Sequence, residues 1–200
     1  MIELLDGDLL IEASYTTLGW AIRKTLSFSD DVAPYNHIGL IFKMDDARRR
    51  YLNYAKDLNL KEDSIGNYYV SEALWHFSVT PFTEYQDAVN GGSSKVTIAR
   101  YLNFNDQTRD AIITSSLTNI GDEYSILKII CFYLDVTFGT NISANLGPSR
   151  MVCSTSVADS YAWYYKFNEL KDPRKITPDD IWQHVKANEA WQLVEVERRQ

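Results

Sequence analysis

The sequence changes character near its middle, and this change constrains the fold more than any other feature. Short apolar runs typical of strands dominate the first half, at residues 7–13, 37–44, 68–74, 75–79 and 94–101. Segments with helical spacing dominate the second half, at residues 105–120, 124–136, 152–165 and 177–185. Strand patterns followed by helix patterns predict an α+β fold.

Smaller signals refine this prediction. The run at 37–44 is the clearest strand, and 191–197 alternates like a last one. A helical pattern covers 15–26. Residues 45–66 are charged and predict an exposed insertion with a short helix at 46–58.

Bulk composition limits the size class and the partners. Two hundred residues with 45% hydrophobic content suit one domain, so we expect a single domain over residues 1–200. Twenty basic and 27 acidic residues give a net charge of −7, which argues against nucleic acid or anionic membrane as a partner. The basic run Arg48–Arg50 is flanked by aspartates and fits a solvated face.

The location of the protein is also constrained. The first 13 residues contain no cationic segment, and no 18 consecutive residues are apolar, so we expect no export signal and no transmembrane segment. Two cysteines, Cys131 and Cys153, fit a reducing compartment, and Cys131 fits a core position. We therefore expect a cytoplasmic protein, and the alternatives are a phage-encoded protein or release by lysis.

Cys153 lies where a loop gives way to a helix. Gly147, Pro148 and Ser149 punctuate the chain, and neither Pro nor Gly interrupts residues 152–165. The unpaired N–H groups and the macrodipole at a helix start favour a thiolate, so Cys153 is a candidate nucleophile at the rim of the fold. The alternative is a small buried hydrophobic residue.

His37 opens the clearest strand and so lies at the rim of the sheet, where catalytic groups are common. If residues 68–73 form the next antiparallel strand, Glu72 lies near His37. A carboxylate that orients an imidazole beside a thiol is the Cys-His-acid arrangement of covalent hydrolases. The alternative for Glu72 is an exposed strand residue; His76 fits packing and His184 a partly exposed helix position.

Several well-known motifs are missing from the sequence. It contains no phosphate-binding Walker loop, no Rossmann glycine set, no paired Cys-x-x-Cys and no His-Glu-x-x-His. We therefore expect no cofactor and no metal ion.

Eight short segments together resemble one known family. They are "GDLLIE", "HIGLIF", "YYVSEA", "VTPFTEY", "VTIARY", "GDEYSILK", "MVCSTSVAD" and "TPDDIW". Their order resembles that of the permuted papain-like NlpC/P60 enzymes of the YiiX and YaeF kind, in which the histidine strand precedes the cysteine helix. The resemblance implies a circularly permuted papain-like fold, a small antiparallel barrel-like sheet packed against the cysteine helix. It also implies Cys153 as nucleophile, His37 as base and Glu72 as third member.

The resemblance further implies a cysteine hydrolase that forms an acyl-enzyme on an amide bond, such as that of a peptidoglycan-type peptide. The alternatives are a lipid acyl thioesterase or acyltransferase, and a non-catalytic binding module with the same fold. The expected partner is a small peptide, amide or acyl-lipid substrate, with Tyr35, Trp75 and Tyr124 as candidate substrate-binding residues. The oligomeric state stays open.

Overall fold

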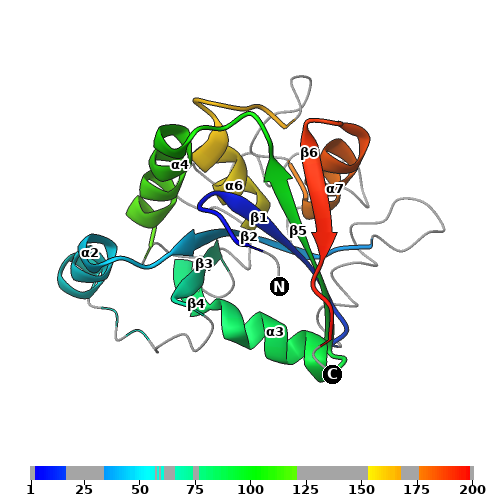
Figure 1. The fold of residues 1–200 in the computed structure, drawn as a ribbon, viewed down its shortest axis with the longest axis horizontal. Helices are drawn as coiled ribbons and strands as arrows, with labels where there is room; N and C mark the ends of the chain where they lie inside the picture. The colour runs from blue at the N-terminus through cyan, green and yellow to red at the C-terminus, as the bar shows by residue number, and fades with distance from the viewer. Residues whose placement is uncertain are drawn as a thin grey trace, which may run out of the picture.

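The protein is represented by a computed structural model that describes residues 3–16, 34–56, 58, 60, 66–73, 77–120, 153–167 and 176–198. These residues form a six-stranded sheet in the order β4-β3-β2-β1-β5-β6, and every neighbouring pair is antiparallel (Figure 1). The strands are β1 (Asp8–Ser14), β2 (His37–Lys43), β3 (Tyr68–Ala73), β4 (Phe77–Pro81), β5 (Ser94–Tyr101) and β6 (Trp191–Glu195). The strand-rich first half of the sequence is confirmed, and the last strand completes the sheet.

Five helices accompany the sheet in the described part of the chain. They are α2 (Asp46–Lys56), α3 (Phe82–Asn90), α4 (Asp106–Thr118), α6 (Cys153–Tyr161) and α7 (Pro178–Ala187). The mixed α+β class is thus confirmed. The predicted helix at 124–136, which includes Cys131, lies outside the described residues, as does most of the one at 15–26.

The helix starts follow the capping chemistry in the sequence. The side chain of Asn105 accepts a hydrogen bond from the backbone N–H of Thr108 at the start of α4. At the start of α7, Thr177 and Asp180 form a reciprocal capping box, with Pro178 in the first turn. None of the described helices is long and apolar enough to cross a membrane.

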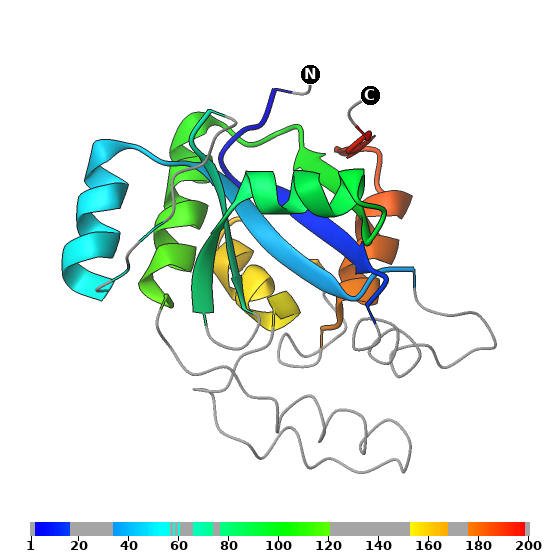
Figure 2. The same ribbon diagram turned by 90° about the horizontal axis from the view of Figure 1, so that it is seen from below.

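The two faces of the sheet bury different helices. Apolar side chains of α4, α6 and α7 pack with Leu9, Ile38 and Leu40 on one face. Side chains of α3 pack with Leu10 and Ile41 on the other face. Figure 2 shows α3 on the opposite side of the sheet from α6. Because successive side chains along β1 and β2 point to opposite faces of the sheet, the core is divided into two layers.

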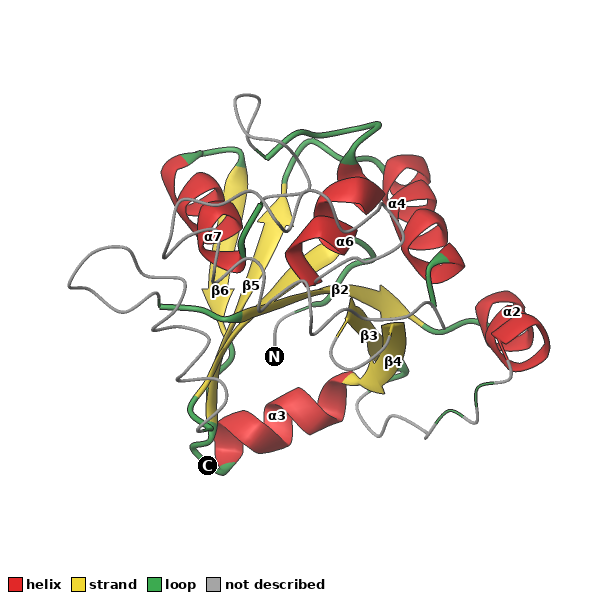
Figure 3. Cartoon of the chain, turned by 180° about the vertical axis from the view of Figure 1, so that it is seen from behind, coloured by secondary structure: helices red, strands yellow, loops and turns green. Residues whose placement is uncertain are grey.

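Helix α6 is fixed at both ends by polar contacts to other elements. The hydroxyl of Ser154, next to Cys153, donates a 2.6 Å hydrogen bond to the carbonyl of Ile176, just before α7. At the other end, the buried Tyr161 hydroxyl donates to the carbonyl of Gly7, before β1. Figure 3 shows α6 between α4 and α7 on its face of the sheet. The Ser154 contact fixes the start of α6, and the Tyr161 contact fixes the far end of the helix near the start of β1.

Candidate active site

His37 and Glu72 meet at the end of the β2–β3 pair. Glu72 lies opposite Gly39, two residues from His37, so the two side chains share a face and are diagonal neighbours. His37 Nε2 and Glu72 Oε2 are 2.6 Å apart, and both residues are buried. The predicted contact between these residues is therefore present, whereas the alternative of an exposed Glu72 is wrong.

Glu72 is a buried carboxylate with several donors around it. The Tyr85 hydroxyl donates to the same oxygen, Oε2, that faces His37. Burial alone would raise the pKa of Glu72, but the contacts with His37, Thr80 and Tyr85 outweigh it and lower that pKa below its ordinary value. Glu72 is thus ionised at neutral pH.

His37 lies between Glu72 and Cys153. Burial alone would lower the pKa of His37, but hydrogen bonding and charge from Cys153 and Glu72 raise it well above its ordinary value of 6.5. Because Nε2 faces Glu72, Nδ1 is the ring nitrogen left for the thiol. The arrangement favours a protonated imidazole between two acidic groups.

Cys153 is the first residue of α6, as the loop-to-helix pattern predicts. The predicted rim position needs a correction, because Cys153 is only 6% exposed and belongs to the core between α6 and the sheet. The sequence does not reveal this burial, because other elements pack over the helix start. Cys153 thus combines the burial of a core residue with an influence on His37, because it helps to raise the pKa of the imidazole.

The predicted substrate-binding residues are placed only in part. Tyr35 is buried, its ring centroid lies 4.5 Å from that of Trp182, and its hydroxyl lies 2.7 Å from Thr97 Oγ1. Its role in substrate binding stays a prediction. Trp75 and Tyr124 lie outside the described residues, as does His76.

His184 lies apart from Glu72, His37 and Cys153. Its Nε2 lies 2.6 Å from the Tyr165 hydroxyl, in an aromatic cluster that includes Trp191. The prediction of a partly exposed helix residue is therefore confirmed, because His184 is half-buried on α7.

Tyr85 is the residue of this group that sequence reasoning missed. It comes from α3, a helix absent from the sequence-based prediction, which placed strands at 75–79 and 94–101 with no helix between them. A signal was present, because Phe82, Tyr85 and Val89 have helical spacing and all three are buried. A helix of about two turns that directly follows a proline gives only a weak periodic pattern beside the neighbouring strands.

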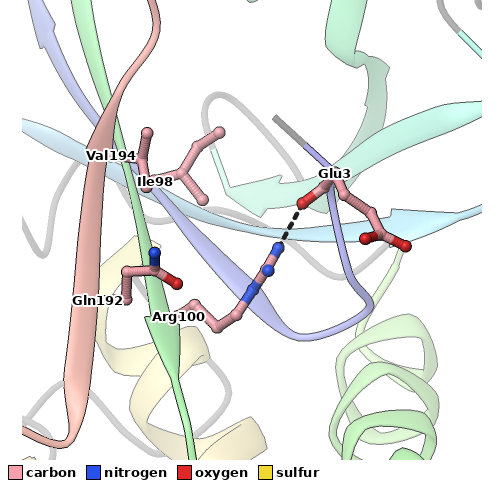
Figure 4. A pocket seen from close by; sticks show the side chains of 5 residues that line it. All are labelled: Glu3, Ile98, Arg100, Gln192 and Val194. Carbon is pink, nitrogen blue, oxygen red and sulfur yellow. Dashed lines mark hydrogen bonds between the residues drawn. The ribbon is translucent and has the colours of Figure 1, made fainter. Parts of the chain in front are cut away.

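A shallow cavity lies at the opposite end of the sheet. Its lining residues are Glu3, Ile98, Arg100, Gln192 and Val194 (Figure 4). Arg100 lies next to Ala99, which pairs with Leu9, whereas His37 pairs with Glu12 at the far end of β1. The Arg100 guanidinium is bound to Asp8 and to the Glu3 carbonyl, so this cavity presents a cation that is already paired.

Within the described ranges, no group of three or more His, Cys, Asp or Glu side chains is arranged to hold a metal ion. The imidazole of His37 is already engaged by Glu72 and Cys153. The described residues therefore do not fit a resident metal.

Comparisons with known proteins identify the fold. No protein-family model matches the sequence, and no curated protein matches it. Among solved structures, the chain is similar to the crystal structure of the metalloprotein YiiX from Escherichia coli O157:H7, with a TM-score of 0.59 and 15% sequence identity. The match covers 98% of each chain. The chain therefore has a YiiX-like fold.

Proposed function

We propose that this protein is a cysteine hydrolase that cleaves an amide bond through an acyl-enzyme. The observation that carries the proposal is the 2.6 Å contact between Glu72 and His37 beside the Cys153 thiol, which together with Glu72 raises the pKa of the imidazole. All three residues are buried, and they come from β3, β2 and α6. A carboxylate, an imidazole and a thiol in this order form the arrangement that activates a nucleophile in covalent hydrolases. The YiiX-like fold and the position of His37 before Cys153 also support a permuted papain-like arrangement.

In the proposed reaction, His37 holds the proton of the Cys153 thiol, and the thiolate sulfur attacks the amide carbonyl carbon. The C=O electron pair moves to oxygen, and N–H groups at the start of α6 are available to stabilise this oxyanion. As the C–N bond breaks, His37 gives its proton to the leaving amine and a thioester remains. Water then attacks the thioester while His37 accepts its proton, and the acid and the free thiol are released.

Glu72 has a supporting role in this scheme. It keeps the His37 ring in one orientation and balances the positive charge of the imidazolium. Its low pKa keeps it ionised across the neutral range. The proposed substrate is a small peptide amide of the peptidoglycan type, with an acyl lipid as the alternative.

Thiol alkylation tests the proposal without knowledge of the substrate. Iodoacetamide is added to the native protein between pH 4 and pH 9, and peptide mass spectrometry separates Cys153 from Cys131. We expect the wild-type Cys153 to react at a pH well below that at which free glutathione reacts, and His37→Ala to remove this advantage. If Cys153 reacts no faster than glutathione at every pH and His37→Ala changes nothing, a non-catalytic binding module is supported instead.

The substrate class needs a second measurement. Wild-type protein is mixed with muropeptides or with a fatty acyl ester, and the reaction is quenched in acid. The mass of Cys153 plus an acyl group identifies the class, and Cys153→Ala provides the blank. An adduct from the fatty ester alone would favour the lipid alternative.

A further inference from the structure

Glu72 Oε2 accepts hydrogen bonds from two directions. His37 approaches from β2 at 2.6 Å, and the hydroxyl of Tyr85 approaches from α3. Both residues are buried, and the carboxylate lies between them. Tyr85 is therefore a further member of the group of contacts that includes Glu72 and His37.

Tyr85 is the donor in this contact. An ionised carboxylate can only accept hydrogen bonds. Burial and the charges of Glu72 and Glu12 raise the pKa of Tyr85 well above its ordinary value, so the phenol keeps its proton at every physiological pH. The hydroxyl therefore always presents a hydrogen to Glu72.

Helix α3 holds Tyr85 rigidly in place. Phe82, Tyr85 and Val89 share one helix face and pack against Leu10 and Ile41 of the sheet. A donor fixed by packing limits the rotation of the carboxylate that it binds. Without this donor, Glu72 would lose one of the contacts that define the orientation of the oxygen facing His37.

We propose that Tyr85 is a positioning residue that acts through Glu72 to hold the His37 imidazole toward Cys153. This inference rests on the proposed function, since it assigns Tyr85 to the same site. Tyr85 touches neither the reacting atoms nor, in this scheme, the substrate. Its effect on hydrolysis therefore falls on kcat and leaves KM nearly unchanged.

Tyr85→Phe is the variant that tests the inference, because it removes the hydroxyl and keeps the ring. Tyr161→Phe is the matched control, since Tyr161 is also buried and its hydroxyl also donates a hydrogen bond, but to the Gly7 carbonyl away from Glu72. We expect Tyr85→Phe to slow alkylation of Cys153 at pH 6 by about three- to tenfold, a fraction of the effect of losing one hydrogen bond to a charged group. Tyr161→Phe is expected to leave that rate within about a factor of two.

A double-mutant cycle shows whether Tyr85 acts through Glu72. In a Glu72→Gln background, Tyr85→Phe should have no further effect on the alkylation rate, because the acceptor that it orients has already changed. An equal effect in both backgrounds would overturn the inference, as would equal losses in Tyr85→Phe and Tyr161→Phe.

The titration of His37, followed by NMR of the imidazole, gives a readout that does not depend on hydrolysis. We expect Tyr85→Phe to move the titration to lower pH, because a less constrained carboxylate stabilises the imidazolium less, whereas Tyr161→Phe leaves it in place. An unreactive wild-type Cys153 with a shifted His37 titration would contradict the proposed function but retain the link from Tyr85 to His37. A reactive wild-type Cys153 with unchanged alkylation and titration in Tyr85→Phe would contradict only the role of Tyr85.

Discussion

Gly39 lies directly opposite Glu72 in the β2–β3 ladder, and the space between them has no room for a side chain at position 39. A Cβ atom there would lie 3.3 Å from the Cβ of Glu72 and 2.5 Å from Cγ1 of Val70. Glycine in a strand interior often marks such a close approach. Gly39 therefore leaves the path from Glu72 to His37 clear.

Gly39→Ala should disturb both stability and the site. Val70 would have to shift in a packed layer, and overpacking of this kind costs about 1–3 kcal/mol of the free energy of unfolding. Urea denaturation measures this loss. Iodoacetamide alkylation of Cys153 at pH 6 should also slow, because the displaced strand moves Glu72 relative to His37.

Gly91→Ala is the matched control for this change. Gly91 caps α3 with a φ of −74°, and its added Cβ would meet only helix carbonyls, the nearer at 3.3 Å. We expect the free energy of unfolding to change by about 0.5 kcal/mol or less. Equal urea midpoints for Gly39→Ala and the wild type would show that the space opposite Glu72 is not restrictive.

Cys153→Ala should abolish hydrolysis and also weaken the fold slightly. The burial of Cys153 means that removal of the sulfur leaves a small void, which costs about 1 kcal/mol of the free energy of unfolding. Thermal and urea denaturation measure the stability, and the muropeptide assay measures the turnover. Retained hydrolysis in this variant would end the assignment of Cys153 as nucleophile.

The contact between His37 and Glu72 could be predicted because it depends on the pairing of two strands that are neighbours in the sheet. A clear strand begins at His37, the next strand ends near Glu72, and antiparallel pairing brings these two ends together. The predicted starts of the helices at residues 105 and 177 depend on local chemistry, since Asn105 and Thr177 each cap a backbone N–H three residues away.

Tyr85 and the burial of Cys153 depend on how helices pack against the sheet. Helix α3 has nine residues and follows Pro81, so its periodicity extends over little more than two turns. The cover over Cys153 comes from the packing of α6 against the sheet, which no local pattern reports. Tertiary contacts therefore supply the part of the site that the sequence did not.

The relative loss of turnover in variants of His37 and Glu72 tests the roles of these two residues. We expect His37→Ala to reduce turnover by about 10²- to 10⁴-fold, since it would remove the proposed general base. Glu72→Gln should reduce turnover less, because the amide still contacts the ring but carries no charge. The double variant should be little worse than His37→Ala alone, since the residues act as one unit.

His76→Ala serves as the comparison for this series, because His76 lies four residues beyond Glu72 in the sequence. Turnover of the muropeptide substrate is measured for each variant, with circular dichroism to verify folding. Loss of turnover in His76→Ala with normal turnover in Glu72→Gln would make His76 the third member in place of Glu72.

The Tyr165 hydroxyl determines which nitrogen of His184 carries the proton. It accepts hydrogen bonds from Asn188 Nδ2 and from Trp191 Nε1, each at 3.0 Å, so both of its lone pairs are engaged. Its own hydrogen therefore goes to His184 Nε2 at 2.6 Å, and that nitrogen is unprotonated. Protonation of His184 would place a second hydrogen against this hydroxyl.

This arrangement predicts a loss of stability in mild acid. Burial lowers the pKa of His184 below its ordinary value of 6.5, so the unfolded chain binds a proton at a higher pH than the folded chain does. The stabilising contribution is complete above pH 6.5 and decreases as the pH falls through 6.5 toward the folded pKa. His37 has the opposite sign, because its pKa is raised and its contribution to stability is lost as the pH rises.

His184→Gln removes only the contribution of His184, since glutamine can still accept from Tyr165 but does not titrate. Urea denaturation at pH 5.5, 6.5 and 7.5 should therefore show that the wild type loses more stability than His184→Gln as the pH falls. Identical pH dependence in the two proteins would contradict the neutral, acceptor state of His184.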